Sequence, residues 1–133
     1  MKEITTREDV VELVTSFYSK IRVHSMLGPI FNTMLPTDEV WEVHLEKLTD
    51  FWETNLFHVI KFKGNPMEAH QRTDKANGNK ITQDHFYDWL MLWNKNIDSQ
   101  FTGEKAELAK EKARRMSTHL YVNLQKNKPK TTE

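Results

Sequence analysis

Apolar residues recur at helical spacing along most of the chain. Near the start they fall at i, i+4, i+7, i+8 and i+11, which predicts an amphipathic helix of about sixteen residues. The members of this stripe are Val10, Val14, Phe17, Tyr18 and Ile21. Thr6 and Asp9 precede it as a variant of the capping box, in which a hydroxyl accepts from the first-turn amides. Gly28-Pro29 is expected to end this helical region.

A second long helix is predicted to begin at Thr37 or Asp38, since either can serve as its cap, and to continue to about residue 60 without glycine or proline. One face of it carries Trp41, His44, Leu48, Phe51, Trp52 and Asn55. Gly64-Asn65-Pro66 closes the region, and a short turn or helical piece over 67–72 then carries a histidine.

Two more helices are predicted in the rest of the chain. Residues 73–80 are polar and favour a loop, after which Thr82 begins a helix whose apolar stripe is Phe86, Trp89, Leu90, Trp93 and Ile97. Gly103 separates it from a last helix over 104 to about 125. No stretch alternates with the period of a strand, so the pattern predicts an all-α fold. We expect one domain over 1–133, with a frayed polar tail at 126–133.

Composition excludes several classes of function. The 133 residues balance 19 Lys and Arg against 19 Asp and Glu, so the basic face that nucleic acid requires is not expected. The sequence has no cysteine, which rules out disulfides, iron–sulfur clusters and thiolate–zinc sites. The first residues lack the apolar core of a signal peptide, and no apolar run approaches the roughly 20 residues that cross a bilayer. We therefore expect a soluble, cytoplasmic protein that is a monomer without a membrane partner.

The six histidines carry the candidate chemistry. None forms the i, i+4 pair with a nearby carboxylate that would indicate zinc, and the sequence lacks a nucleophile motif or a phosphate-binding loop. His44 and His70 stand 26 residues apart, one on an aromatic helical face and one beyond the end of that helix. Two imidazoles on opposite sides of a flat apolar cavity would suit a haem. From the residues alone, an exposed His70 among polar neighbours remains an open alternative.

Five motifs together resemble the group III truncated haemoglobins over roughly residues 10–122. They are Phe17-Tyr18-x-Lys20-Ile21-Arg22, Leu27-Gly28-Pro29-Ile30-Phe31-Asn32, Trp41-x-x-His44-x-x-Lys47-Leu48-x-x-Phe51-Trp52, Asn65-Pro66-x-x-x-His70 and Phe86-x-x-Trp89-Leu90. Each is weak alone, but the joint pattern is specific. The four glycines are isolated, whereas sister groups usually carry Gly-Gly pairs, which favours the third group.

The resemblance implies a truncated globin fold, a two-on-two helical sandwich around a pocket for one b-type haem. His70 matches the proximal iron ligand of the family. Tyr18, His44 and Trp89 match residues over the distal face of the haem. Three further matches line the pocket: Phe31, Leu48 and Trp52. Lys47 and Arg72 are candidates to meet the haem propionates, although each is as readily an ordinary solvated charge.

The expected function follows from these distal donors. A hydroxyl that donates to a partly anionic ligand contributes roughly 1.5–3 kcal/mol, or about ten- to a hundredfold in affinity. Several hydrogen-bond donors around bound oxygen slow its release. Slow release suits O2, peroxide or NO chemistry with an electron donor (peroxidase-like or NO dioxygenase-like) better than it suits O2 transport. CO would bind the same site. The alternatives are an O2 storage or sensing globin, and a helical interaction module without a cofactor.

Overall fold

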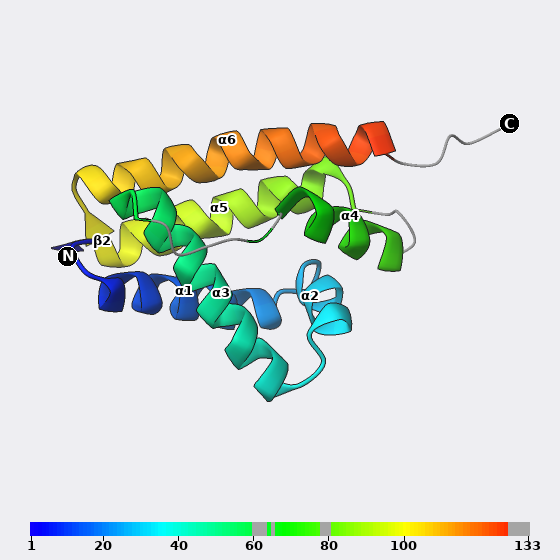
Figure 1. Cartoon of the computed structure of the whole chain (residues 1–133), viewed down its shortest axis with the longest axis horizontal. Helices are drawn as coiled ribbons and strands as arrows, with labels where there is room; N and C mark the ends of the chain where they lie inside the picture. The colour runs from blue at the N-terminus through cyan, green and yellow to red at the C-terminus, as the bar shows by residue number, and fades with distance from the viewer. Residues whose placement is uncertain (60–63, 65, 78–80, 128–133) are drawn as a thin grey trace, which may run out of the picture.

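Figure 1 shows the computed structural model of the chain, which describes residues 1–59, 64, 66–77 and 81–127. Among these residues it contains helices separated by short connections and one pair of two-residue strands. The elements in chain order are β1 (Lys2–Glu3), α1 (Arg7–Arg22), α2 (Gly28–Met34), α3 (Asp38–Phe57), α4 (Pro66–Ala76), α5 (Gln83–Gln100), β2 (Phe101–Thr102) and α6 (Glu104–Asn127). The all-α prediction is confirmed.

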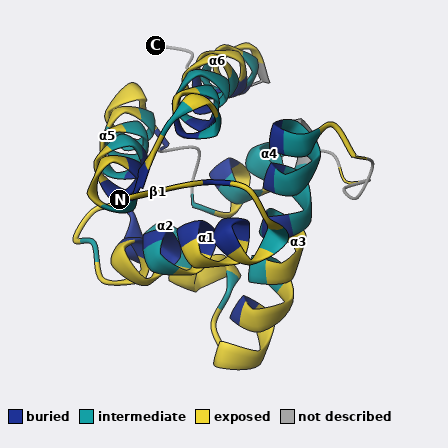
Figure 2. Ribbon diagram, turned by 90° about the vertical axis from the view of Figure 1, so that its left-hand side faces the viewer, coloured by how far each residue is buried: buried dark blue, intermediate teal, exposed yellow. Residues whose placement is uncertain are grey.

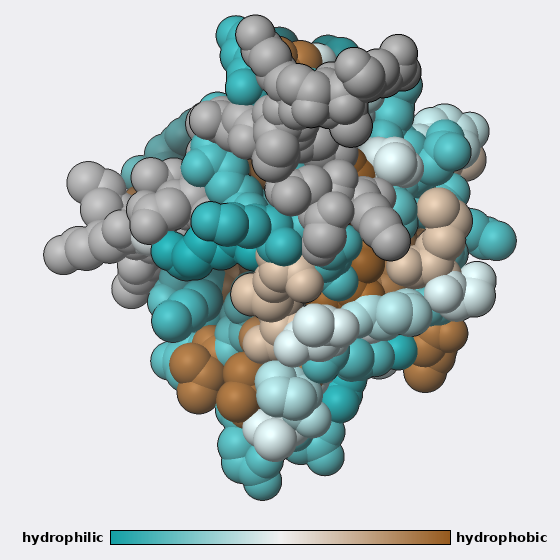
Figure 3. Space-filling view, turned by 90° about the vertical axis from the view of Figure 1, so that its right-hand side faces the viewer, coloured by the Kyte–Doolittle hydropathy of each residue, from teal (hydrophilic) through white to brown (hydrophobic). Residues whose placement is uncertain are grey.

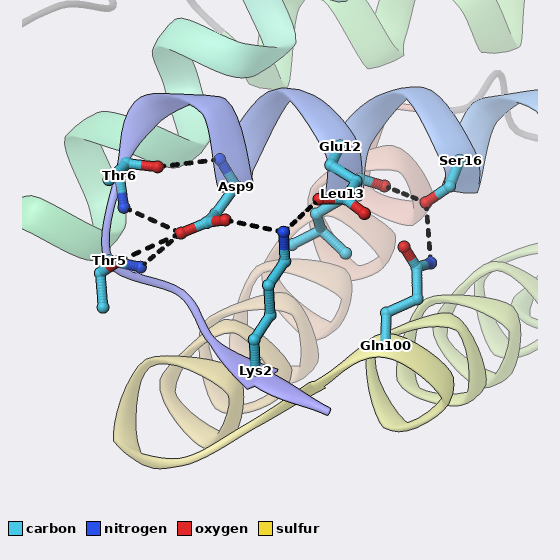
Figure 4. A network of polar contacts seen from close by, with 8 residues as sticks. All are labelled: Lys2, Thr5, Thr6, Asp9, Glu12, Leu13, Ser16 and Gln100. Carbon is cyan, nitrogen blue, oxygen red and sulfur yellow. Dashed lines mark hydrogen bonds and ion pairs between the residues drawn. The ribbon is translucent and has the colours of Figure 1, made fainter.

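The predicted first helix and its cap are both confirmed. α1 is 16 residues long, and the Thr6 hydroxyl accepts from the Asp9 backbone N–H while the Asp9 carboxylate accepts from that of Thr6. Figure 4 shows how Asp9 also accepts from the backbone N–H of Thr5 and pairs with Lys2. These bonds hold the pKa of Asp9 well below its usual range, with the Thr5 backbone as the largest cause. The charged carboxylate thus fixes the start of the helix.

α2 was not predicted, because Gly28-Pro29 was interpreted only as the end of a helical region. In the structure the same pair begins a helix, since proline is tolerated in a first turn where its missing N–H has no partner to lose. Gly28 is required there by close approach: a Cβ would lie 2.8 Å from the carbonyl oxygen of Arg22. The short helix places Phe31 beside α1.

The start of α3 matches the prediction, with Thr37 as its cap, and α5 begins as predicted after Thr82. The predicted loop over 73–80 is wrong for residues 73–76, which continue α4, while 78–80 lie outside the described residues. A helix with so few apolar side chains is stabilised by tertiary contacts. Asp74 is 3% exposed and accepts from the backbone N–H of Ile81 at 3.0 Å.

α6 continues to Asn127, so the first two residues of the predicted frayed tail are helical, and the remaining tail lies outside the described residues. The strand pair was also missed: β1 and β2 are parallel, with Lys2 opposite Phe101 and Glu3 opposite Thr102. Strands of two residues are too short for a sequence pattern. Their pairing holds the N-terminal segment against the loop that joins α5 to α6.

The long helices form two packed pairs. α1 contacts α3, α5 contacts α6, and the two pairs meet through contacts of α1 with α5 and of α3 with α6 (Figure 1). Buried residues face inward from these helices (Figure 2), and three of the four tryptophans, Trp41, Trp52 and Trp93, are at most 1% exposed. This arrangement is the predicted two-on-two sandwich.

The surface is polar, with separate apolar patches. At the end of the molecule that carries α2 and α4, hydrophobic areas are interrupted by hydrophilic ones (Figure 3). Among the residues that the structure describes, no helix is both long and apolar enough to span a membrane.

Candidate functional site: His44 and His70

His70 lies on α4 in a defined protonation state. Its Nδ1 atom is 2.6 Å from the carbonyl oxygen of Pro66, one turn earlier on the same helix. Because a carbonyl only accepts, Nδ1 carries the proton and Nε2 keeps its lone pair. Burial lowers the pKa of His70, so the ring is neutral near pH 7. A neutral imidazole whose second nitrogen donates to a backbone carbonyl is the form in which histidine binds a metal.

His44 lies on α3 and is half-buried. Burial is the largest cause that lowers its pKa to about 4, followed by the charges of Lys47 and of His70. The contribution of His70 places the two imidazoles within electrostatic range of each other. His44 is therefore also neutral near pH 7, with one nitrogen that donates and one that accepts.

Tyr18 reaches the same region from α1 and is 4% exposed. Its ring meets that of Phe31 at 5.7 Å, that of Trp41 at 6.0 Å and that of His44 at 6.4 Å, between centroids. Burial raises the pKa of the Tyr18 hydroxyl, and a hydrogen bond with the Trp89 side chain opposes that rise. An indole N–H can only donate, so this interaction leaves the Tyr18 proton available for a further acceptor.

The predicted residues that line the pocket differ in their surroundings. Phe31 stacks on Trp41 with centroids 6.3 Å apart, and Leu48 is a half-buried residue packed against the core. Trp52 instead stacks on Trp93 of α5 at 4.5 Å and is 1% exposed, so its ring is deep in the aromatic core. Trp89 also stacks on Trp93, with their ring centroids 5.6 Å apart.

The two predicted propionate contacts are exposed residues on different helices. Lys47 lies one turn after His44 on α3 and acts on its pKa. Lys47 and His44 line a surface groove of about 400 Å³, together with Leu35, Glu39, Val40 and Val43. Arg72 lies on α4, two residues after His70. His44 thus has solvent on one side and Tyr18 on the other.

The donor set fits a haem better than a bare metal ion. Among the described residues there is no cluster of three or more His, Asp or Glu side chains that could hold an ion. A single imidazole with a free Nε2 suffices when a porphyrin supplies the other ligands. The aromatic rings around His44 and Tyr18 provide the apolar wall that such a macrocycle needs.

Two features of this site were missed from the sequence. The sequence pattern places Trp41 on one face of the second long helix and gives it no role of its own, yet its indole Nε1 is buried without a hydrogen-bond partner. Phe86, read as part of an apolar stripe, stacks on His70 with centroids 6.4 Å apart. The helical stripes contained both residues, but periodicity does not say which stripe residue faces a functional side chain.

The long helices form two packed pairs, and His44 and His70 lie within electrostatic range of each other. None of the established family models matches the sequence. The chain is 28% identical over 125 residues to the group 3 truncated hemoglobin ctb of Campylobacter jejuni, which covers 93% of this chain and 94% of that protein. It superposes on the crystal structure of a group III truncated hemoglobin from Campylobacter jejuni with a TM-score of 0.84 and 27% identity, over 98% of this chain and 100% of that chain. In sequence and in fold the chain is similar to group III truncated haemoglobins. This likeness implies a haem cofactor and small gaseous ligands.

Proposed function

We propose that the protein binds one b-type haem through Nε2 of His70. The hydrogen bond from Nδ1 of His70 to the Pro66 carbonyl carries this proposal, because it fixes the tautomer and the ring orientation that an axial ligand needs. Phe31 and Leu48 would contact the porphyrin, and Lys47 and Arg72 would face its propionates. Trp52 would support the pocket from the core, since it stacks on Trp93.

Haem, when bound, supplies an iron centre that takes O2, NO, CO or peroxide. The residues of this chain then decide which of these is held and for how long. Tyr18 donates its hydroxyl proton to the ligand and is itself oriented by Trp89, whose N–H is directed to the phenol oxygen. His44 stays neutral at pH 7 and presents a second N–H from α3. These donors stabilise negative charge that develops on a bound ligand.

We infer that the protein serves O2, peroxide or NO redox chemistry rather than O2 transport. Strong donation slows the release of oxygen, which a carrier must achieve quickly, whereas the same donors favour cleavage of an O–O bond. Turnover of this kind requires an electron donor, which we propose is a separate reductase. We further propose that the chain acts as one domain and as a monomer in the cytoplasm. A storage or sensing role with the same haem site is the second candidate.

The absorption spectrum of the purified protein tests the haem site directly. We expect a Soret band that His70→Ala abolishes and His119→Ala leaves unchanged, because His119 is an exposed residue of α6. A colourless, folded protein that does not take up added haemin would overturn the proposal and favour a helical interaction module without a cofactor. Retention of the band in His70→Ala would overturn the assignment of the ligand alone.

A further inference from the structure

Trp41 has a buried donor for which the structure supplies no acceptor. The side chain is 1% exposed and its indole Nε1 makes no hydrogen bond. A buried N–H without a partner costs roughly 1–3 kcal/mol, so native proteins nearly always provide an acceptor. The neighbours of the indole therefore determine which group can accept a hydrogen bond from its N–H.

Four side chains surround the Trp41 ring in contacts that the structure defines. Phe31 stacks on it at 6.3 Å and the Arg22 guanidinium lies 4.9 Å from its centroid, but the first is apolar and the second only donates. Tyr18 lies 6.0 Å away, and its oxygen is engaged with Trp89. His44 lies 6.0 Å away with its ring at 81° to the indole, so the imidazole and the indole meet edge to face.

His44 offers the complementary group. Its ring is neutral near pH 7 and so has one nitrogen that can only accept. The structure gives His44 no hydrogen bond to any described residue, so this nitrogen lacks a donor just as Trp41 lacks an acceptor. The two residues are three apart on α3, which makes them neighbours on one helical face.

We propose that Trp41 is a positioning residue for His44: its indole N–H donates directly to one imidazole nitrogen and thereby holds the ring turned inward. The bond selects a single tautomer, because the accepting nitrogen cannot carry a proton. The remaining N–H then points away from Trp41, on the side where Tyr18 lies, instead of into the solvent groove. Trp41 itself is held in place by Arg22, which covers the indole and forms a salt bridge of 2.9 Å with Asp38 at the start of α3.

This pairing matters for ligand binding only if the proposed role of His44 is correct, but it is measured on the side chains of this chain. The experiment is heteronuclear NMR of the purified chain with 15N-labelled histidine and tryptophan. If the chain contains haem, the sample is reduced and saturated with carbon monoxide. We expect one His44 tautomer and a scalar coupling across the hydrogen bond between Trp41 Nε1 and a His44 ring nitrogen. In Trp41→Phe, which keeps an aromatic ring and removes the N–H, the tautomer preference should fall by roughly fivefold, as expected from the loss of one neutral hydrogen bond.

Trp93→Phe is the matched control. It also removes a buried indole N–H, the one that donates to the Ala109 carbonyl at 3.2 Å, and should lower stability while leaving the His44 tautomer unchanged. Absence of the coupling together with the same tautomer ratio in Trp41→Phe would overturn the proposal. If Trp41→Phe does not fold, the coupling in the unaltered chain decides. A chain without a Soret band but with the coupling would contradict the proposed function and leave this inference standing.

Discussion

The Nδ1 atom of His70 lies 2.6 Å from the carbonyl oxygen of Pro66. Pro66 is the first residue of α4 and His70 is one turn later, so the bond lies within the first turn of the helix. It orients the imidazole. In a helix with few apolar residues, this local bond defines the direction of a side chain that the hydrophobic pattern does not constrain.

The first prediction concerns Tyr18, whose buried hydroxyl is proposed to donate to the ligand. Tyr18→Phe should speed oxygen release from the haem-loaded protein by about ten- to a hundredfold, since a hydrogen bond to a charged group contributes roughly 1.5–3 kcal/mol. Stopped-flow measurement of the dissociation rate gives the answer. Tyr121→Phe is the control, because Tyr121 lies on α6 against Phe86. Fast, monophasic release that Tyr18→Phe does not change would contradict the redox proposal.

The second prediction concerns stability at acidic pH. The folded protein holds the pKa of His44 at about 4, below the ordinary 6.5, mainly through burial. Above pH 6.5 both folded and unfolded chains carry a neutral His44, so this group then has no effect on stability. Between pH 6.5 and 4 the unfolded chain binds the proton first and the folded state loses stability.

Because His44 is only half-buried, solvent screens part of this effect. We expect protonation of His44 to lower the free energy of unfolding by about 1–2 kcal/mol between pH 7 and pH 4.5. Urea unfolding at both pH values should show it, and His44→Gln should reduce the difference by that amount. His85→Gln, on the first turn of α5, serves as the control for removing a histidine. An identical pH dependence in the unaltered protein and in His44→Gln would be inconsistent with a neutral, buried His44.

The third prediction separates core from pocket at Trp52. Because this ring is 1% exposed and stacks on Trp93, Trp52→Ala should cost about 3–5 kcal/mol in the free energy of unfolding. Trp52→Phe, which is milder, should lower the melting temperature and leave the position of the Soret band unchanged. Thermal unfolding and absorption spectra of the same samples measure both effects. A shifted band in a variant of unchanged stability would place the indole against the haem instead.

The fourth prediction concerns the carboxylate that caps α1. Asp9→Asn should destabilise the protein by about 2 kcal/mol, because it removes charge from an acceptor of several hydrogen bonds that has only 8% of its surface exposed. Since the folded pKa of Asp9 is depressed, its contribution is present at neutral pH and declines as the pH falls below the ordinary range of aspartate. Denaturant unfolding measures the change. Glu8→Gln, in the same turn but exposed, should have little effect.

The long helices could be predicted from the sequence because their burial is periodic. α1, α3, α5 and α6 carry apolar stripes at the spacing of a helix, and Thr6, Thr37 and Thr82 mark where three of them begin. α2 and the end of α4 could not be found in this way. α2 is seven residues long, and α4 is held by polar contacts such as Gln71 with Asn123 of α6, which no local pattern encodes.

The sequence by itself determined the all-α fold class and selected Tyr18, His44, His70 and Trp89 as candidate site residues, because their types and spacing resemble the pattern of one family. Only the tertiary structure decided what surrounds each of these side chains. It directs the Trp89 indole to Tyr18, buries Trp52 against Trp93 and leaves the N–H of Trp41 without an acceptor beside His44. The reason is physical: helical periodicity fixes the face on which a side chain lies, whereas its hydrogen-bond partner depends on which helix packs opposite.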